Sequence, residues 1–145
     1  MSQQPRLQCF PQWPFPEFTW HAWTDDDGTL PILVLLPTAG GWVGWHRELV
    51  DGFPFRVNYL LVTIGGNHRV AVDPRVISSL KQFRAEWPQR AIILYGCSRG
   101  GRWIWEIALE HPVLFDAAVA CAGYPPTKDE DRNRMQARQV AHTHS

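Results

Sequence analysis

A serine flanked by glycines, between an apolar run and an amphipathic stretch, most constrains how this chain can fold. Residues 91–95 predict a buried strand, Gly96-Cys97-Ser98-Arg99-Gly100 follows directly, and apolar residues then recur at helical spacing until Pro112. This G-x-S-x-G pattern suits a sharp strand-to-helix turn, because residues two before and two after the serine must lack bulk there. The pattern predicts a serine Oγ that stands above a sheet edge at a helix N-terminus, where the N–H of Arg99 could stabilise an oxyanion.

Apolar runs alternate with helix signals along most of the chain. Residues 30–36, 57–64 and 116–121 predict buried strands, and residues 42–50, 73–87 and 99–111 predict helices. Asp73-Pro74 places an N-cap carboxylate before a proline at the first helical position. This order predicts an α/β fold, a three-layer αβα sandwich around a mostly parallel sheet. In such sheets, sites form beyond the carboxyl ends of the strands.

The ends of the chain differ from its middle. Residues 1–16 hold four prolines and predict an extended N-terminal arm. Residues 18–23 are rich in aromatic and β-branched types and predict a strand, and Asp27-Gly28 predicts a hairpin turn into the run at 30–36. We expect the domain to span residues 17–126, and the polar, charge-mixed residues 127–145 to form a C-terminal tail.

Composition excludes several classes of partner. The 145 residues carry no formal net charge, so we expect no nucleic-acid partner. The longest aliphatic run has five residues, where about 20 are needed to cross a bilayer, so we expect no membrane partner. The first ten residues lack the apolar stretch of a signal peptide, and we expect a cytoplasmic protein.

The cysteines, Cys9, Cys97 and Cys121, form no C-x-x-C pair or Cys/His cluster. This predicts reduced, mostly buried thiols and no metal site, and we expect no cofactor.

Together these segments resemble the α/β-hydrolase superfamily, in particular its esterase and depolymerase-like members. The resemblance covers about residues 17–126. It rests on three features: the apolar run at 32–36 followed by PTAGG (37–41), the segment YGCSRGG (95–101) with the helix signal after it, and the segments EHP (110–112), LFDAAV (114–119) and AG (122–123). It implies a serine hydrolase for a small carboxylic ester or related acyl substrate, with Ser98 as nucleophile. The N–H groups of Arg99 and Ala39 would form the oxyanion hole. Pro37-Thr38 stands where members often have His-Gly.

The resemblance also implies an acid and then a histidine after the serine, each following a further strand. This chain reaches about where the seventh strand is expected, which predicts a fold incomplete after the sixth strand, with an exposed sheet edge that the tail or a second chain could cover. His68, which follows the run at 57–64, and His144 are the candidate bases. The tail offers acids and histidines in the implied order: Asp129, Glu130, Asp131, His142 and His144.

Two functions remain open at this level. One is an active serine hydrolase, whose acyl pocket Trp42, Trp45 and Trp103 could line if they do not serve as core packing instead. The other is a catalytically incomplete relative that acts as a binding or interaction module. A histidine ring nitrogen within hydrogen-bond reach of the Ser98 Oγ would distinguish them. Cysteine chemistry at Cys97 is disfavoured, because that residue occupies a variable position of the pattern.

Overall fold

A single mixed β-sheet organises the chain. The computed structural model describes residues 6–8, 17–23, 26–42, 46–52, 54–66 and 71–123. Its six strands lie in the order β1-β2-β4-β3-β5-β6. Their bounds are β1 Arg6–Gln8, β2 Phe18–Ala22, β3 Ile32–Leu36, β4 Asn58–Val62, β5 Ile92–Cys97 and β6 Ala117–Cys121. The helices are η1 Ala39–Gly41, α1 His46–Asp51, α2 Pro74–Glu86, α3 Arg99–Glu110 and η2 Pro112–Leu114.

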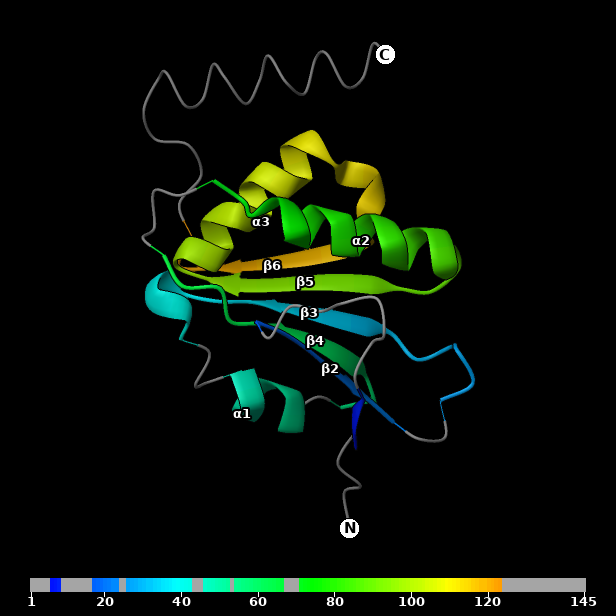
Figure 1. Ribbon diagram of the computed structural model, residues 1–145. Coiled ribbons are helices and arrows are strands. Elements are labelled where there is room, and N and C mark those ends of the chain that lie inside the picture. The colour runs from blue at the N-terminus through cyan, green and yellow to red at the C-terminus, as the bar shows by residue number, and fades with distance from the viewer. Residues whose placement is uncertain are drawn as a thin grey trace.

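Strand direction matches the prediction in part. The four neighbouring strands β4, β3, β5 and β6 run parallel, whereas β1 and β2 join the β4 edge antiparallel. Helices α2 and α3 cover one face of the sheet and α1 lies on the other (Figure 1). The α/β class is therefore confirmed, with a sheet that is mixed. The carboxyl ends of β3, β4 and β5 meet at one edge, which is where α3 begins.

The hairpin predicted at Asp27-Gly28 is wrong. Strand β2 pairs with β4, with Phe18 opposite Val62, and β4 separates it from β3. Both edges of β3 are occupied by parallel strands and all five of its side chains are buried. The Asp26 carboxylate instead fixes the connecting loop, accepting hydrogen bonds from the N–H groups of Gly28 (3.0 Å) and Leu30 (3.2 Å).

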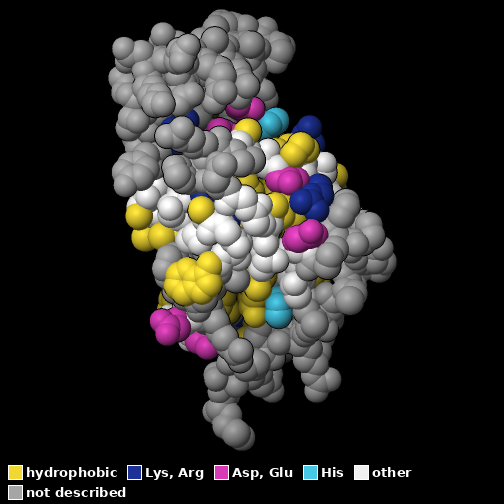
Figure 2. Space-filling model, turned by 60° about the vertical axis from the view of Figure 1, so that its left-hand side comes forward, with side chains coloured by type: hydrophobic (Ala, Val, Ile, Leu, Met, Phe, Trp, Pro, Cys, Tyr) yellow, Lys and Arg dark blue, Asp and Glu magenta, His cyan; other side chains and the backbone are white. Residues whose placement is uncertain are grey.

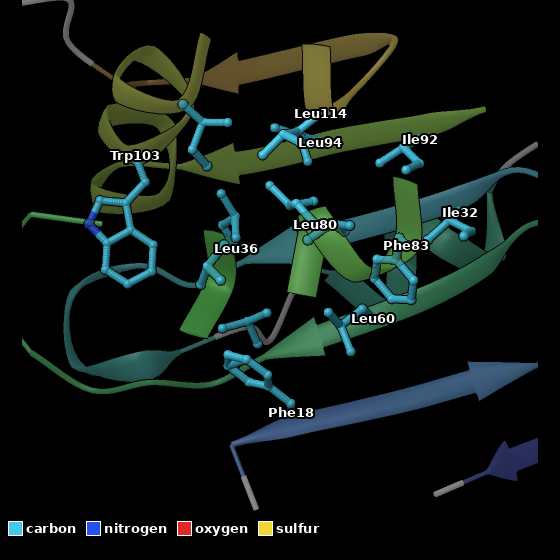
Figure 3. Close-up of a cluster of buried hydrophobic side chains, with 14 of the residues drawn as sticks. Phe18, Ile32, Leu36, Leu60, Leu80, Phe83, Ile92, Leu94, Trp103 and Leu114 are labelled. Carbon is cyan, nitrogen blue, oxygen red and sulfur yellow. The ribbon is translucent and has the colours of Figure 1, made fainter. Parts of the chain in front are cut away.

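The main core lies between the sheet and helices α2 and α3 (Figure 3). Alternate positions of the strands, such as Ile92 and Leu94, meet Leu80 and Phe83 of α2 and Ile107 of α3. Burial of one such side chain contributes about 1.5–3 kcal/mol, so this face supplies most of the stability. A smaller cluster of Leu33, Leu35 and Val57 packs under α1 on the other face.

The predicted boundaries can be compared with the structure only in part. Strand β1 lies inside the expected arm and is extended, as four prolines there favour. Residues 124–145, which include the whole of the expected tail, lie outside the described residues. Within the described part of the chain, no helix combines the length and the apolar character that crossing a membrane requires.

Candidate active site

Ser98 occupies the turn between β5 and α3 in a backbone conformation that few residues adopt. Its φ is 57° and its ψ is −113°. A non-glycine residue held this way costs of order 1–3 kcal/mol and persists only where its surroundings enforce it. The side chain is exposed, and its hydroxyl makes no capping hydrogen bond to α3. The Oγ is therefore presented outward from a strained corner at the N-terminus of a helix.

Two glycines make this corner sterically possible. A Cβ on Gly96 would lie 2.3 Å from the carbonyl carbon and oxygen of Gly100. A Cβ on Gly100 would lie 2.8 Å from the carbonyl oxygen of Leu36 and 2.9 Å from that of Pro37. Real Cβ atoms do not approach backbone this closely, so larger residues would force the strands and α3 apart. The glycine spacing read from the sequence is thus required by contacts on both sides of Ser98.

Hydrogen bonds hold Ser98 between β6 and α3. Its N–H donates to the carbonyl of Cys121 (3.0 Å), and its carbonyl accepts from the N–H of Arg102 (3.0 Å). Gly101 and Gly123 pack against each other just above, since a Cβ on Gly101 would lie 2.6 Å from the Cα of Gly123. The end of β6 is consequently part of the frame that fixes the Ser98 turn.

The loop after β3 lies beside this turn. Its N–H groups are mostly engaged: Thr38 donates to Trp42 (3.2 Å), Gly40 to Gly66 (2.8 Å) and Gly41 to Thr38 (3.0 Å). No acceptor within the described part of the chain takes the N–H of Ala39. The Gly100 contacts with Leu36 and Pro37 bring this loop against the start of α3. Ala39 is exposed, so its N–H is available at the same sheet edge as Ser98.

The side chain of Arg99 is buried, although the sequence singled out only its backbone N–H. It is 1% exposed, donates one hydrogen bond through Nη2 to the carbonyl of Ile64, and lies 4.5 Å from the centre of the Trp103 ring. Its Nε and Nη1 have no hydrogen-bond partner among the described residues. Burial lowers the pKa of the Arg99 guanidinium, and the charge of Asp73 opposes that shift. The guanidinium ties the end of β4 to the start of α3 directly behind Ser98.

The histidines that the structure describes in full lie far from Ser98. His111 follows the last residue of the 12-residue helix α3, about 18 Å along its axis. His21 stacks on Tyr59 with ring centres 4.2 Å apart, at the amino end of β4 and thus at the opposite edge of the sheet. The candidate bases His68 and His144 lie outside the described residues, as does the side chain of His46. The structure therefore places no sequence-predicted base beside Ser98 and tests none.

The three candidate pocket tryptophans have different positions. Trp42 ends the loop after β3 and is 54% exposed, close in sequence to Ala39. Trp103 is 1% exposed in the main core, beneath Arg99, which is the packing role that the sequence left open. Trp45 lies outside the described residues. Only Trp42 is thus seen at the surface of the candidate site.

Figure 2 views the molecule from the edge where β5 ends and α3 begins. Hydrophobic side chains, together with backbone and uncharged polar side chains, occupy the middle of the described surface there, and charged side chains lie mostly toward its margins. Such a surface suits an uncharged group approaching backbone N–H donors.

The sequence did not predict the pairing of two cysteines in this region. Cys97 and Cys121 are 24 positions apart but are direct neighbours across β5 and β6. The one signal was that consecutive strands of such sheets are often neighbours, and this does not fix the register that pairs Cys97 with Cys121. The expectation of mostly buried thiols holds for Cys97, whereas Cys121 is exposed.

Comparisons with known proteins bear on the fold. No protein-family model matches the sequence, and no curated protein is significantly similar to it. A solved structure described as a ferulic acid esterase superposes with a TM-score of 0.51 at 17% identity, over 86% of this chain and 63% of that chain. A structure described as a thermostable esterase gives a TM-score of 0.47 at 15% identity, over 87% of this chain and 48% of that chain. The chain thus shares the fold of the first of these over less than two thirds of that protein's length.

Proposed function

We propose that this protein is a serine hydrolase that acts on a small carboxylic ester or related acyl substrate, with Ser98 as its nucleophile. The observation that carries the proposal is the positive φ of Ser98, 57°, at an exposed strand-to-helix corner. A strained residue at such a corner points to function, because nothing in local sequence preference favours it there. The shared fold with an esterase agrees with this reading.

The proposed reaction is acyl transfer to Ser98. Its Oγ attacks the carbonyl carbon of the substrate, and its proton passes to a histidine base. The N–H groups of Arg99 and Ala39 stabilise the oxyanion that forms, an effect worth about 3–4 kcal/mol per donor in related chemistry. The alcohol leaves with a proton from the same histidine, and water then releases the acid from Ser98. Trp42 and Trp45 would face the acyl group.

The base is proposed to be His68 or His144. His68 follows β4, whose carboxyl end reaches the same sheet edge as Ser98. His144 lies in the acid- and histidine-containing segment after β6. Loss of the true base should lower turnover by about 10⁶-fold, while the oxyanion hole and binding retain about 10³–10⁴ over water. His68→Ala and His144→Ala, assayed separately, would identify which residue acts.

Covalent labelling by a fluorophosphonate tests the nucleophile. The wild-type protein should label, and Ser98→Ala should not. Ser78→Ala is the matched control, because Ser78 is an exposed serine on α2, away from the turn. Circular dichroism of each variant establishes that it is folded. Equal labelling of Ser98→Ala and wild type would refute the assignment of Ser98.

The alternative is a catalytically incomplete relative that acts as a binding module. It is favoured by the positions of His21 and His111, the two histidines that the structure describes in full, far from Ser98. A fold incomplete after the sixth strand would lack the segments that position acid and base. Folded wild-type protein that fails to label at all would support this alternative over the hydrolase.

A further inference from the structure

Two free thiols lie side by side at the base of the Ser98 turn. Cys97 is the last residue of β5, Cys121 is the last residue of β6, and the two are register partners in the parallel pair. Register partners on parallel strands direct their side chains to the same face. Neighbouring strands are about 4.8 Å apart, within the Cα separation of about 4.4–6.8 Å that a disulfide spans.

Their exposure gives the two thiols different roles. Cys121 is exposed and Cys97 is buried. Burial, and then contact with Cys121, raises the pKa of the Cys97 thiol. The pKa of the Tyr95 hydroxyl, on the same face of β5, is likewise raised by burial and by Cys121. An oxidant from solution therefore reaches Cys121 first, with Cys97 next to it as a second thiol.

The backbones of both cysteines are linked directly to Ser98. Cys97 precedes it directly, and the carbonyl of Cys121 accepts the Ser98 N–H (3.0 Å). Ala122 adopts a positive φ of 52°, and Gly123 then packs against Gly101. A disulfide holds its two Cβ atoms about 3.5–4.5 Å apart, so a bond at this position would fix the separation of β5 and β6 beside the turn. Any adjustment of that separation shifts the backbone that holds Ser98.

We propose that Cys97 and Cys121 form a redox-active dithiol that a peroxide converts into a reversible cross-strand disulfide. The Cys121 thiolate attacks the hydroxyl oxygen of the peroxide and the O–O bond breaks, which gives Cys121 sulfenic acid. The leaving hydroxide (or alkoxide) takes up a proton to become water (or an alcohol). The Cys97 thiolate then attacks the Cys121 sulfur and hydroxide leaves, taking up a proton to become water. Both sulfurs are oxidised and the peroxide is reduced by two electrons. A disulfide with one exposed sulfur, as Cys121 would provide here, is readily reduced again by a dithiol.

A regulatory consequence rests on the proposed function of Ser98. Displacement of the turn moves Oγ away from the oxyanion donors, and misplacement by about 1 Å can cost about 100-fold in rate. We therefore expect the disulfide form to react with a fluorophosphonate at least about tenfold more slowly, and dithiothreitol to restore the rate.

The chemical test uses hydrogen peroxide on the full chain, followed by alkylation and trypsin digestion without reduction. The wild type should lose the mass of two hydrogen atoms and give peptide 91–99 joined to peptide 103–128. Cys9→Ser, the matched control, should do the same. Cys121→Ser and Cys97→Ala should not. Full alkylation of Cys97 and Cys121 after peroxide, or oxidation of Cys121 to a sulfinic acid without the joined peptides, would overturn the dithiol.

The second readout separates this inference from the proposed function. Joined peptides with an unchanged labelling rate at Ser98 would overturn the regulatory consequence and leave the dithiol supported. If the reduced protein never labels, the hydrolase proposal fails, while the joined peptides still decide the dithiol. A slower rate in oxidised wild type that Cys121→Ser abolishes supports both.

Discussion

At the scale of single residues, the Ser98 turn depends on backbone segments that touch where glycines allow it. Gly96 and Gly100 face each other, and Gly100 also faces the end of β3. The strain at Ser98 is offset by the burial and strand pairing around it. Small changes here should therefore affect both stability and the reactivity of Ser98.

Replacing Gly100 by alanine should destabilise the protein by about 1–3 kcal/mol, because the new Cβ meets the carbonyls of Leu36 and Pro37 and overpacks the turn. Urea unfolding measures the loss, and fluorophosphonate labelling should slow as the turn shifts. Gly65→Ala is the control, since its Cβ would meet nothing closer than 3.8 Å and its φ is not positive. Equal stability of the two variants would contradict the packing argument.

A buried ion pair fixes the loop before β3. The guanidinium of Arg90 contacts Asp26, with side chains 2% and 10% exposed, and Asn58 Nδ2 also donates to this carboxylate (2.6 Å). Burial alone would raise the pKa of Asp26, but hydrogen bonds from Leu30, Arg90 and Gly28 outweigh it and lower the pKa. The carboxylate therefore stabilises the fold while it is ionised.

Asp26→Asn should cost about 3 kcal/mol at pH 7, because it leaves the buried Arg90 without its counter-charge. Since the folded pKa lies below the unfolded value near 3.9, the stabilisation is complete above about pH 5 and is lost as the pH falls through the folded pKa. The stability difference between wild type and variant should shrink below about pH 4, measured by urea unfolding. Asp51→Asn, which removes an exposed carboxylate of α1, is the control for the loss of one negative charge.

At the scale of elements, helix α2 illustrates how local chemistry sets a boundary. Asp73 is its N-cap, Pro74 occupies the first helical position, and the Asp73 Oδ1 accepts the N–H of Arg75 (2.9 Å). Val76, Leu80 and Phe83 then face the sheet. The N-cap, the proline and the spacing of the apolar residues all indicate the same first residue of α2. The predicted start of this helix is therefore confirmed.

The Asp73 cap can be tested by substitution. Asp73→Ala should lower stability by about 1 kcal/mol, because the Arg75 N–H loses its acceptor. Asp73→Ser should recover most of this loss, since its Oγ can accept the same hydrogen bond. Thermal or urea unfolding provides the measurement. Equal losses for alanine and serine would indicate that the Asp73–Arg75 ion pair matters more than the cap.

At the scale of the whole molecule, β6 ends the sheet with its outer edge unpaired among the described residues. All five of its residues are exposed, none is charged, and Val119 is 51% exposed. Natural sheets protect such edges with charge, proline or a covering segment. The expectation that the tail or a second chain covers this edge remains a prediction, and a second copy of the protein is the case that can be tested directly.

Ala118→Lys should weaken this association, because a charge on an edge strand opposes strand pairing. Sedimentation across a range of concentrations should show dimers of the wild type and mainly monomers of the variant. Ser78→Lys, which adds the same charge on the exposed side of α2, should dimerise as wild type does. Wild-type protein that stays monomeric throughout would exclude a second copy as the cover of this edge.

The sequence by itself determined the elements and the turn that carries Ser98. Apolar runs, the Asp73-Pro74 start of α2 and the glycines around Ser98 act over a few residues, so their consequences follow from local sterics and hydrogen bonding. The order of the strands in the sheet does not follow from local sterics and hydrogen bonding, because many arrangements of the strands bury the same apolar runs. Only the tertiary structure placed β2 against β4 and brought Cys97 beside Cys121 across β5 and β6. It also buried the Arg99 guanidinium behind the nucleophile. Those contacts depend on packing between segments far apart in the chain, which no local pattern encodes.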